Sequence, residues 1–296
     1  MFLVFSWKPK CMISEEQFQK ELDLIISNAV REDVGDGDHS SLACIPASAT
    51  GKAKLLVKDE GIIAGVEFAK LVFVYIDPKL KMEVLIEDGN PVKYGDVVFY
   101  VEGSSQSILK AERLVLNAMQ RMSAIATKTR DFVSLLDGTD TKILDTRKTT
   151  PGIRALEKWA VKIGGGENHR FALYDMVMLK DNHIDFAGGI TKAIQKTQEY
   201  LKNKGKDLKI IVEARDMDEV DEILQSDGVH RILLDNFDYE QTREAVKRIG
   251  AKCQTESSGG INEETIRAYA ECGVDYISSG ALTHSVYNMD LSLKAV

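Results

Sequence analysis

The chain has 296 residues, of which 44% are hydrophobic, enough to bury the core of one large α/β unit or of two domains. Its 46 acidic and 38 basic residues give a formal net charge of -8, which argues against nucleic acid as the main partner. The four cysteines lie far apart without a CxxC pair, so neither a zinc site nor a disulfide framework is indicated, and we expect a reducing cytoplasm.

The first residues, MFLVFSWKPKCM, begin with a short apolar run that lacks the basic region and cleavage site of a signal peptide. Met12 is a candidate translation start, because Ser14 and Gln17 have the spacing of a capping box before a predicted helix over residues 14–31. Residues 32–41, EDVGDGDHSS, predict a turn. No stretch approaches the roughly 20 apolar residues of a membrane span, so we expect a soluble protein that does not engage a membrane.

Short apolar runs and turn residues between positions 50 and 101 predict an α+β sandwich. The strands are expected at residues 52–57, 61–65, 81–86 and 96–101, with a helix over residues 66–76. A long amphipathic helix is predicted over residues 109–136.

After Asp140 the pattern changes to apolar strands that end in polar residues and are each followed by a helix. These strands are expected at residues 142–148, 175–182, 209–215, 231–236, 252–260 and 274–280. The last four begin at 209, 231, 252 and 274, a spacing of 21 or 22 residues that suits one βα unit each. A βα barrel is therefore predicted, with a further strand left open near residues 159–163.

Residues 145–183 place six cationic or potentially cationic side chains beside the glycines of positions 164–166, in a chain of negative net charge. These side chains are Arg147, Lys148, Arg154, His169, Arg170 and Lys180. Several follow strands directly, where a βα barrel places its chemistry, so we predict a site for an anion with more than one negative group.

Two further groups stand at predicted strand ends. Glu213 and Asp235 close consecutive strands and could hold a divalent cation, although an ion pair with a neighbouring Lys or Arg is the simpler alternative. The glycine-containing residues 257–260 and 280–283 follow the last two strands, where barrels often bind phosphate. The three groups together predict a phosphorylated, metal-bound substrate next to a small polycarboxylate, as in a transferase.

The motifs AERLVLNAMQRMSAIAT, DTRKTTPGIRALEKWAVKIGGGENHR, LKDNH, LLDNF, ESSGGI and SSGALTHS closely resemble the quinolinate phosphoribosyltransferase family. The resemblance runs in order from about Arg31 to Leu291. It implies transfer of phosphoribosyl from 5-phosphoribosyl 1-pyrophosphate to quinolinate with decarboxylation, giving nicotinate mononucleotide, pyrophosphate and CO2 for NAD biosynthesis. Magnesium is the implied cofactor.

The implied fold is type II phosphoribosyltransferase-like. An N-terminal α/β sandwich over residues 12–112, completed by residues 285–296, precedes an incomplete, seven-stranded α/β barrel over residues 113–284. The resemblance also implies a homodimer or hexamer with its active site at the subunit interface.

The resemblance implies which individual residues bind each of the two substrates. The implied quinolinate ligands are Arg113 of a neighbouring subunit, Arg147, His169, Arg170 and Lys180. The implied phosphoribosyl pyrophosphate ligands are Lys148, Glu213, Asp235, Ser258, Gly259, Gly260 and Gly280. Lys148, Lys180, Glu213 and Asp235 are the expected catalytic residues, and Glu213 and Asp235 would hold the metal directly or through water. Ala214 and Arg215 depart from the family's usual VEVE, which leaves the ligands there open.

The pyridine nitrogen of quinolinate has no proton to lose, so we expect neither a general base nor a covalent enzyme intermediate. Three other functions stay open on the residues alone. Lys180 could be the Schiff-base lysine of a barrel aldolase. The chain could instead transfer phosphoribosyl to nicotinate or another ring, or be a non-catalytic phosphate-binding protein.

Overall fold

The computed structural model describes residues 13–296, so the candidate start at Met12 and the segment before it lie outside the described residues. The chain forms two compact units. Among the described residues, the first takes in residues 13–130, Thr149–Gly165 and Leu282–Val296, and the second comprises Asp131–Lys148 and Gly166–Ala281. Helix α4 (Ser105–Leu135) runs on through position 113, where the sequence predicts a boundary, and that boundary stays a prediction.

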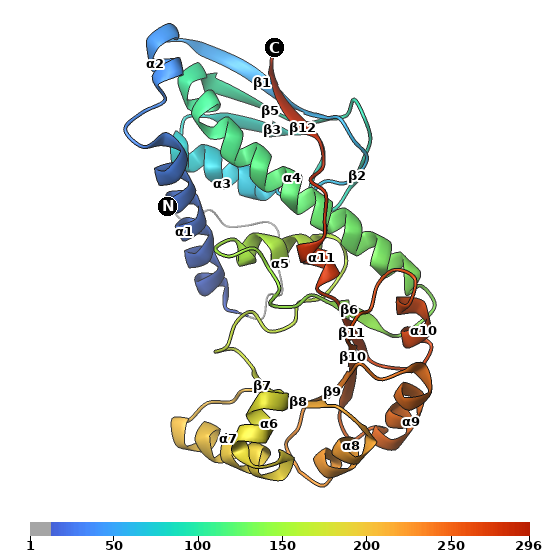
Figure 1. The fold of residues 1–296 in the computed structure, drawn as a ribbon. Helices are drawn as coiled ribbons and strands as arrows, with labels where there is room; N and C mark the ends of the chain where they lie inside the picture. The colour runs from blue at the N-terminus through green and yellow to red at the C-terminus, as the bar shows by residue number, and fades with distance from the viewer. Residues whose placement is uncertain (1–12) are drawn as a thin grey trace. The chain divides into compact units, whose positions relative to one another are not determined.

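The sheet of the first unit has four antiparallel strands in the order β12-β1-β5-β3 (Figure 1). Their bounds are β1 Thr50–Val57, β3 Lys81–Val84, β5 Val97–Ser104 and β12 Leu291–Ala295. Buried Ala53, Leu55 and Val57 alternate along β1 with less buried residues, which is the period-2 pattern of a sheet with one face on the core. The C-terminal strand β12 pairs with β1, with Leu293 opposite Leu55. A separate pair joins β2 (Gly61–Ile62) to β4 (Pro91–Val92).

Besides α4, the first unit holds α1 (Glu15–Val34), α2 (His39–Cys44), α3 (Val66–Ile76) and α5 (Arg154–Ile163). The side chain of Ser14 accepts the Gln17 N–H at 3.2 Å and begins α1, as the sequence predicts. The turn expected over residues 32–41 is confirmed at residues 35–38, but it is shorter than expected, because α1 continues through Val34 and Asp38 caps α2.

Helix α5 corrects two expectations about residues 154–163. No strand forms near residues 159–163, because this segment is helical and buries Trp159 against Phe18, with ring centroids 5.6 Å apart. Lys158, which as a lysine in a helix is expected on the surface, is only 2% exposed. The charged residues Arg154, Glu157, Lys158 and Lys162 have the spacing of one helix face, but Glu157 and Lys158 are buried together with the apolar residues of α5.

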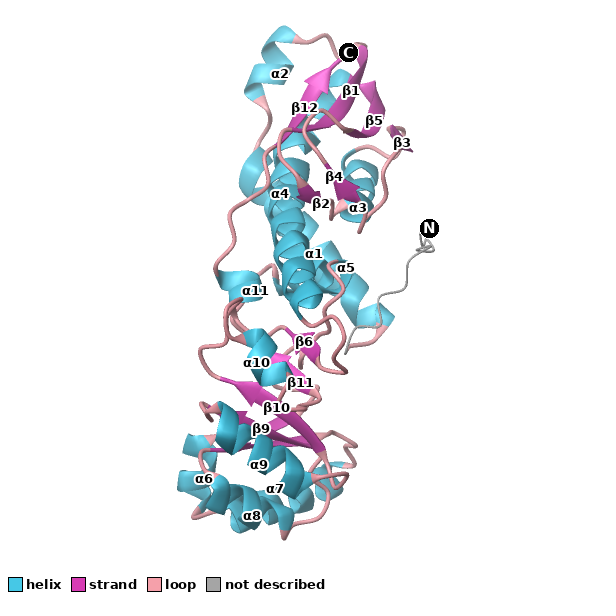
Figure 2. Ribbon diagram, turned by 90° about the vertical axis from the view of Figure 1, so that its right-hand side faces the viewer, coloured by secondary structure: helices cyan, strands magenta, loops and turns pink. Residues whose placement is uncertain are grey.

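The second unit is built on a parallel sheet in the order β6-β11-β10-β9-β8-β7 (Figures 1 and 2). The strands are β6 Lys142–Leu144, β7 Val177–Leu179, β8 Ile210–Ala214, β9 Arg231–Asp235, β10 Gln254–Ser258 and β11 Tyr276–Ser278. The helices that follow are α6 Asp181–Ala187, α7 Ile190–Lys204, α8 Met217–Leu224, α9 Tyr239–Ile249, α10 Ile266–Ala270 and the short α11 Ala281–His284 at the unit boundary. All six predicted strand positions are confirmed.

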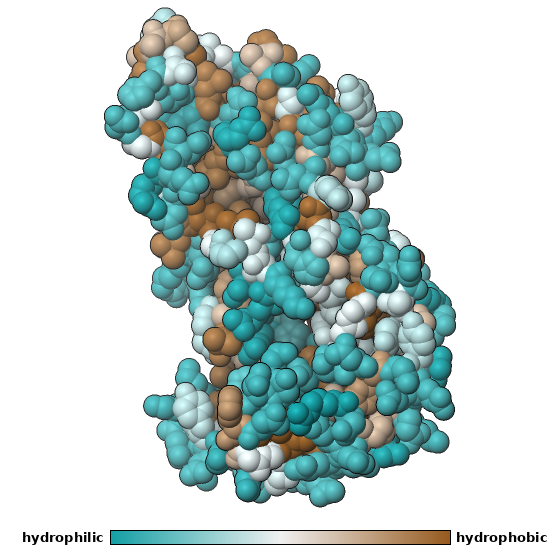
Figure 3. All heavy atoms as spheres, in the orientation of Figure 1, coloured by the Kyte–Doolittle hydropathy of each residue, from teal (hydrophilic) through white to brown (hydrophobic). Residues whose placement is uncertain are grey.

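Both faces of this sheet are covered, which explains the nearly continuous apolar runs. One face packs on the helices through a large core cluster that includes Leu179, Val212 and Leu234. The alternate residues Met178, Ile211 and Leu233 form a smaller cluster, so they lie on the opposite, inner face. The outside of the unit is mainly hydrophilic in the view of Figure 3, with scattered hydrophobic patches.

The expectation of seven barrel strands is corrected to six parallel strands among residues 13–296. In place of a seventh, a single parallel bridge joins Leu144 to Glu167. The ladder stops there because the next backbone donor, the N–H of His169, bonds to the side chain of Asp145 instead of to a strand carbonyl. Barrel closure stays a prediction, while the mixed α/β class with an N-terminal sheet domain is confirmed. No helix within the described part of the chain is long and apolar enough to cross a membrane.

Candidate functional site

The carboxyl ends of the parallel strands gather almost all of the predicted site residues at one edge of the second unit, since parallel strands end on the same side. These residues are Arg147, Lys148, His169, Arg170, Lys180, Glu213, Asp235, Ser258, Gly259, Gly260 and Gly280. Arg113 lies instead on α4 in the first unit, where it is exposed, and its part in the site stays a prediction.

The segment from Glu167 to Arg170 is fixed by a buried carboxylate at the end of β6. Asp145 is fully buried and accepts the backbone N–H of His169 at 2.8 Å and the side-chain amide of Asn168 at 2.6 Å. At its far end the segment reaches β7, where Arg170 Nη1 donates to the carbonyl of Met176 at 3.3 Å. One short segment thus contacts the beginning or end of both outer strands of the sheet.

Arg147 and Arg170 form a cation pair. Arg170 is 7% exposed, and burial together with the nearby charge of Arg147 lowers the pKa of its guanidinium. Because the two like charges repel each other, an anion bound near both would be stabilised by both. Because a guanidinium matches a carboxylate with two parallel hydrogen bonds, the pair suits a ligand with more than one carboxylate.

Lys180 and Glu213 form an ion pair at the ends of β7 and β8. Lys180 Nζ lies 2.8 Å from Glu213 Oε2, with side chains 46% and 6% exposed. Lys180 also precedes α6, whose first turn is capped as predicted when His183 Nδ1 accepts the Lys180 N–H at 3.1 Å. The chain therefore fixes Lys180 through its backbone and its ammonium together.

Asp235, at the end of β9, shares the negative field of Glu213. Burial and the Glu213 charge raise the pKa of Asp235, while Lys180 opposes the rise. Two carboxylates that disfavour each other's ionisation gain from a cation between them. No group of three or more His, Cys, Asp or Glu that could hold a metal occurs among residues 13–296. The pair nevertheless fits Mg²⁺, which usually takes one or two carboxylates and completes its shell with water and substrate phosphates.

The loop after β10 needs glycine at position 259. Ser258 is the register partner of Asp235, and its carbonyl accepts the Asn236 N–H at 2.9 Å. Gly259 has a φ of 108°, and a Cβ there would overlap the Asn236 side chain and lie 3.0 Å from its backbone nitrogen. Asn236 itself has a φ of 57°. Two left-handed residues thus let the β9 and β10 loops pack closely, with backbone open to an anion.

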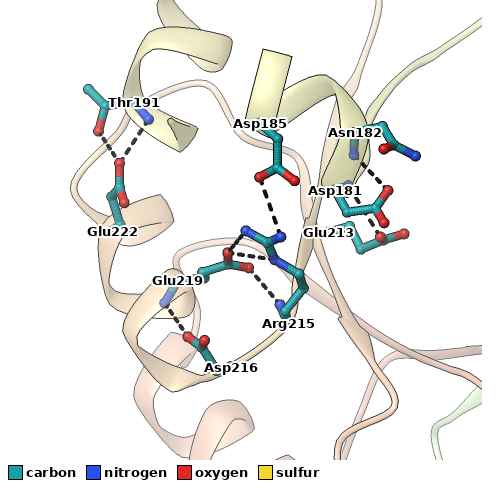
Figure 4. A network of polar contacts seen from close by, with 9 residues as sticks. All are labelled: Asp181, Asn182, Asp185, Thr191, Glu213, Arg215, Asp216, Glu219 and Glu222. Atoms are coloured by element: carbon teal, nitrogen blue, oxygen red, sulfur yellow. Dashed lines mark hydrogen bonds and ion pairs between the residues drawn. The ribbon is translucent and has the colours of Figure 1, made fainter. Parts of the chain in front are cut away.

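Arg215, the departure from the family pattern, does not face Glu213. Figure 4 shows its guanidinium turned toward α6 and α8, where it lies 3.4 Å from Asp185 and 2.8 Å from a Glu219 oxygen. Continued alternation would turn Arg215 to the same face as Glu213 and Ile211, but β8 ends at Ala214, before Arg215. The substitution therefore leaves the Lys180–Glu213 pair intact.

Sequence reasoning names Glu256 only as a strand-end residue and does not single out Arg231. Glu256 is fully buried on the inner face, with Oε2 2.8 Å from Arg231 Nη1 and 3.3 Å from His169 Nε2. Burial would raise the pKa of Glu256, but the charges of His169 and Arg231 outweigh it and lower the pKa to about 2. The available signal was the charge of Arg231 at the start of an otherwise apolar run.

The strand ends of the parallel sheet combine a cation pair, a carboxylate pair and close glycine loops. This combination is typical of α/β enzymes that act on anionic, phosphorylated substrates. The family described as Quinolinate phosphoribosyl transferase, C-terminal domain, matches residues 125–294, and its N-terminal domain matches residues 38–123. The chain belongs to the quinolinate phosphoribosyltransferase family, which is a family of pentosyltransferases.

Individual relatives agree with this assignment. The chain is 44% identical over 289 residues to quinolinate phosphoribosyltransferase (decarboxylating) 1b of Nicotiana tabacum, covering 93% of this chain and 82% of the relative. The chloroplastic nicotinate-nucleotide pyrophosphorylase (carboxylating) of Arabidopsis thaliana is 43% identical with the same coverage, 93% and 82%. The crystal structure of NadC from Streptococcus pyogenes matches with a TM-score of 0.86 and 36% identity, over 96% of this chain and 99% of that one.

Proposed function

We propose that the protein transfers phosphoribosyl from 5-phosphoribosyl 1-pyrophosphate to quinolinate and releases CO2, giving nicotinate mononucleotide and pyrophosphate for NAD biosynthesis. The observation that supports the proposal is that two kinds of binding site lie at one edge of the sheet. The Arg147–Arg170 pair suits a dicarboxylate, and the Lys180–Glu213–Asp235 group with the loop at Gly259 suits a phosphorylated sugar.

Quinolinate is held by cations in this proposal. Arg147 and Arg170 bind its two carboxylates, with Lys180 as a third cation and His169 at the edge of the pocket. Fixing the ring beside the reacting carbon removes much of the entropic barrier, an effect that can supply several kcal/mol, about 7 or more in favourable cases.

The bond changes need no general base. The ring nitrogen attacks C1 of the ribose with its lone pair while the bond from C1 to the pyrophosphate oxygen breaks, and pyrophosphate leaves with that electron pair. The nitrogen is then cationic, so it stabilises the electrons left on the ring when CO2 departs, and a proton takes the vacated carbon. Lys148 stabilises the growing negative charge of the leaving group, and Glu213 and Asp235 hold the ribose hydroxyls.

Magnesium is the proposed cofactor. Glu213 and Asp235 would hold it directly or through water, and when bound it neutralises pyrophosphate charge. Chelation with EDTA should abolish turnover, and added Mg²⁺ should restore it. Full activity in metal-free buffer would contradict this part of the proposal.

The decisive experiment mixes protein, quinolinate, phosphoribosyl pyrophosphate and Mg²⁺ and measures nicotinate mononucleotide and CO2. Nicotinate replaces quinolinate in a parallel reaction, because a single carboxylate would use only part of the cation pair. A preference for nicotinate would identify a different ring substrate. Borohydride trapping of Lys180 with a carbonyl substrate would instead favour an aldolase, and phosphate binding without turnover would favour a binding protein.

We also propose a homo-oligomer, dimer or hexamer, in which Arg113 completes the neighbouring subunit's site. Its exposure on α4 leaves the side chain accessible to a second copy. Arg113→Ala and Lys180→Ala variants should each retain only a small fraction of the wild-type activity, and mixed hybrids should regain part of the loss. Confirmed hybrids without any recovery would refute shared sites.

A cytoplasmic location is proposed as well. Cys44, Cys253 and Cys272 are free thiols, in keeping with a reducing compartment. The Arabidopsis relative is named chloroplastic, so fractionation of the source cells is the test. Recovery of the protein with chloroplasts or mitochondria would contradict the proposal.

A further inference from the structure

A buried charged group lies behind the proposed quinolinate pocket. Glu256, His169 and Arg231 are 0%, 5% and 7% exposed, and one oxygen of Glu256 contacts both partners. Arg231 is fixed in turn, with its guanidinium 3.9 Å from the ring centroid of Tyr276 and Nη2 3.3 Å from Gln254 Oε1. The carboxylate is therefore held in one place by the inner face of the sheet.

The two ring nitrogens of His169 have different neighbours. Nδ1 accepts the backbone N–H of Arg170 at 2.7 Å, and an accepting nitrogen carries no proton. The ring proton of the neutral imidazole is then on Nε2, which lies 3.3 Å from the Glu256 carboxylate. A carboxylate at this position favours the Nε2–H form, since the other tautomer would turn a lone pair toward negative charge.

Two successive backbone N–H groups, those of His169 and Arg170, donate to side chains. Asp145 accepts the His169 N–H at 2.8 Å, and His169 Nδ1 accepts the next N–H, that of Arg170. The Arg170 side chain can then turn only about its own bonds, and one of the five N–H donors of its guanidinium, on Nη1, bonds to the Met176 carbonyl. The position of the guanidinium, whose charge interacts with that of Arg147, depends on these two backbone hydrogen bonds.

We propose that Glu256 is a positioning residue for the quinolinate pocket, which it serves by fixing His169 as the Nε2–H tautomer so that Nδ1 holds the Arg170 backbone. Glu256 itself touches no substrate. The inference rests on the proposed function of the site, and it goes beyond that function by assigning work to a residue outside the ligand set.

The first test separates the two substrates kinetically. Glu256→Gln should raise the KM for quinolinate about tenfold, the effect of weakening one charge-assisted contact, and change kcat and the KM for phosphoribosyl pyrophosphate less than about twofold. Glu256→Asp, which keeps the charge, should recover part of the loss. The matched control is Glu271→Gln, an exposed acid bonded to Arg267 at 2.8 Å, and it should behave as wild type. Equal losses for both substrates would overturn the inference.

A double-mutant cycle tests whether Glu256 acts through His169. Asn at position 169 can still accept the Arg170 N–H near the place of Nδ1 but has no Nε2. In a His169→Asn background, Glu256→Gln should therefore change the quinolinate KM less than about twofold further. Independent effects that multiply in the double variant would overturn the proposed route.

The wild-type protein provides a test that needs no variant to fold. Nitrogen-15 NMR of the labelled imidazole should report protonated Nε2 and unprotonated Nδ1 for His169 at neutral pH. Protonation at Nδ1 would overturn the inference, even in a protein that makes nicotinate mononucleotide. A wild type that makes none would instead refute the proposed function, so the two failures are distinct.

Discussion

Lys180 is the cation that compensates Glu213, with 2.8 Å between Nζ and a carboxylate oxygen that is almost fully shielded from water. The same ammonium lowers the pKa of Asp235, against the burial and the Glu213 charge that raise it. One lysine thus pairs with Glu213 and opposes part of the rise in the pKa of Asp235. An ion pair at this place was the alternative to metal binding in the sequence, and the pair and a bound cation are compatible because Asp235 adds a second negative charge.

The first prediction concerns Lys180→Met. Removing the ammonium should raise the pKa of Asp235 further, so this carboxylate stays protonated to a higher pH and the acidic limb of the activity profile moves upward. Turnover measured against pH at saturating substrates checks the shift. Lys202→Met, on the exposed face of α7, is the control and should leave the profile in place. An unchanged acidic limb in an active Lys180→Met variant would separate Lys180 from the carboxylates.

Arg170→Lys tests the cation pair. The substitution keeps a positive charge but loses the bidentate fork, which costs about 1.5–3 kcal/mol, or roughly 10- to 100-fold in affinity. The KM for quinolinate should rise by that factor, with little change for phosphoribosyl pyrophosphate. Arg248→Lys is the matched control, because Arg248 also bonds two carboxylates, those of Asp221 and Glu244, on the surface. A quinolinate KM within twofold of wild type would argue against a carboxylate fork at Arg170.

Gly259→Ala addresses the close approach of the β9 and β10 loops. The added Cβ would displace Asn236, so the KM for phosphoribosyl pyrophosphate should rise more than that for quinolinate. Gly250→Ala is the control, since Gly250 also has a positive φ, 54°, but only Lys247 O, at 3.9 Å, lies within 4 Å of its Cβ. Both variants carry the backbone strain of about 1–2 kcal/mol. Equal kinetics in the two would show that the contact with Asn236 does not shape the phosphate loop.

The sequence predicted the features that depend on a single strand and on the residue that closes it. The buried runs of β8 and β9 predicted those strands, and the polar residue that closes each, Glu213 or Asp235, followed from the position of the strand end. Contacts between side chains of neighbouring strands could not be predicted in this way. Arg231 contacts Glu256 because of the register in which β9 and β10 pair. This register cannot be predicted from either strand segment alone.

Helix α5 shows a second limit of sequence reasoning. The sequence left a further strand open near residues 159–163, because the alternating apolar residues Trp159, Val161 and Ile163 fit a strand as well as a helix. Arg215 shows a third limit, because its direction depends on Asp185 and Glu219, which neighbouring helices supply. In both cases part of the surroundings comes from another element, Asp185 of α6 for Arg215 and Phe18 of α1 for Trp159.

The last prediction follows from the acidity of Glu256. Its pKa is about 2 in the folded protein against an ordinary value of 4.5, so its charge stabilises the fold above pH 4.5 and this contribution disappears as the pH falls toward 2. The shift corresponds to about 3 kcal/mol. Glu256→Gln should therefore lose stability at neutral pH, by about 3–5 kcal/mol because Arg231 stays buried without its partner charge. The variant should also lose less stability than wild type between pH 4.5 and 2. Urea unfolding at a series of pH values checks both effects, and parallel pH curves for the two proteins would show that Glu256 is not ionised in the fold.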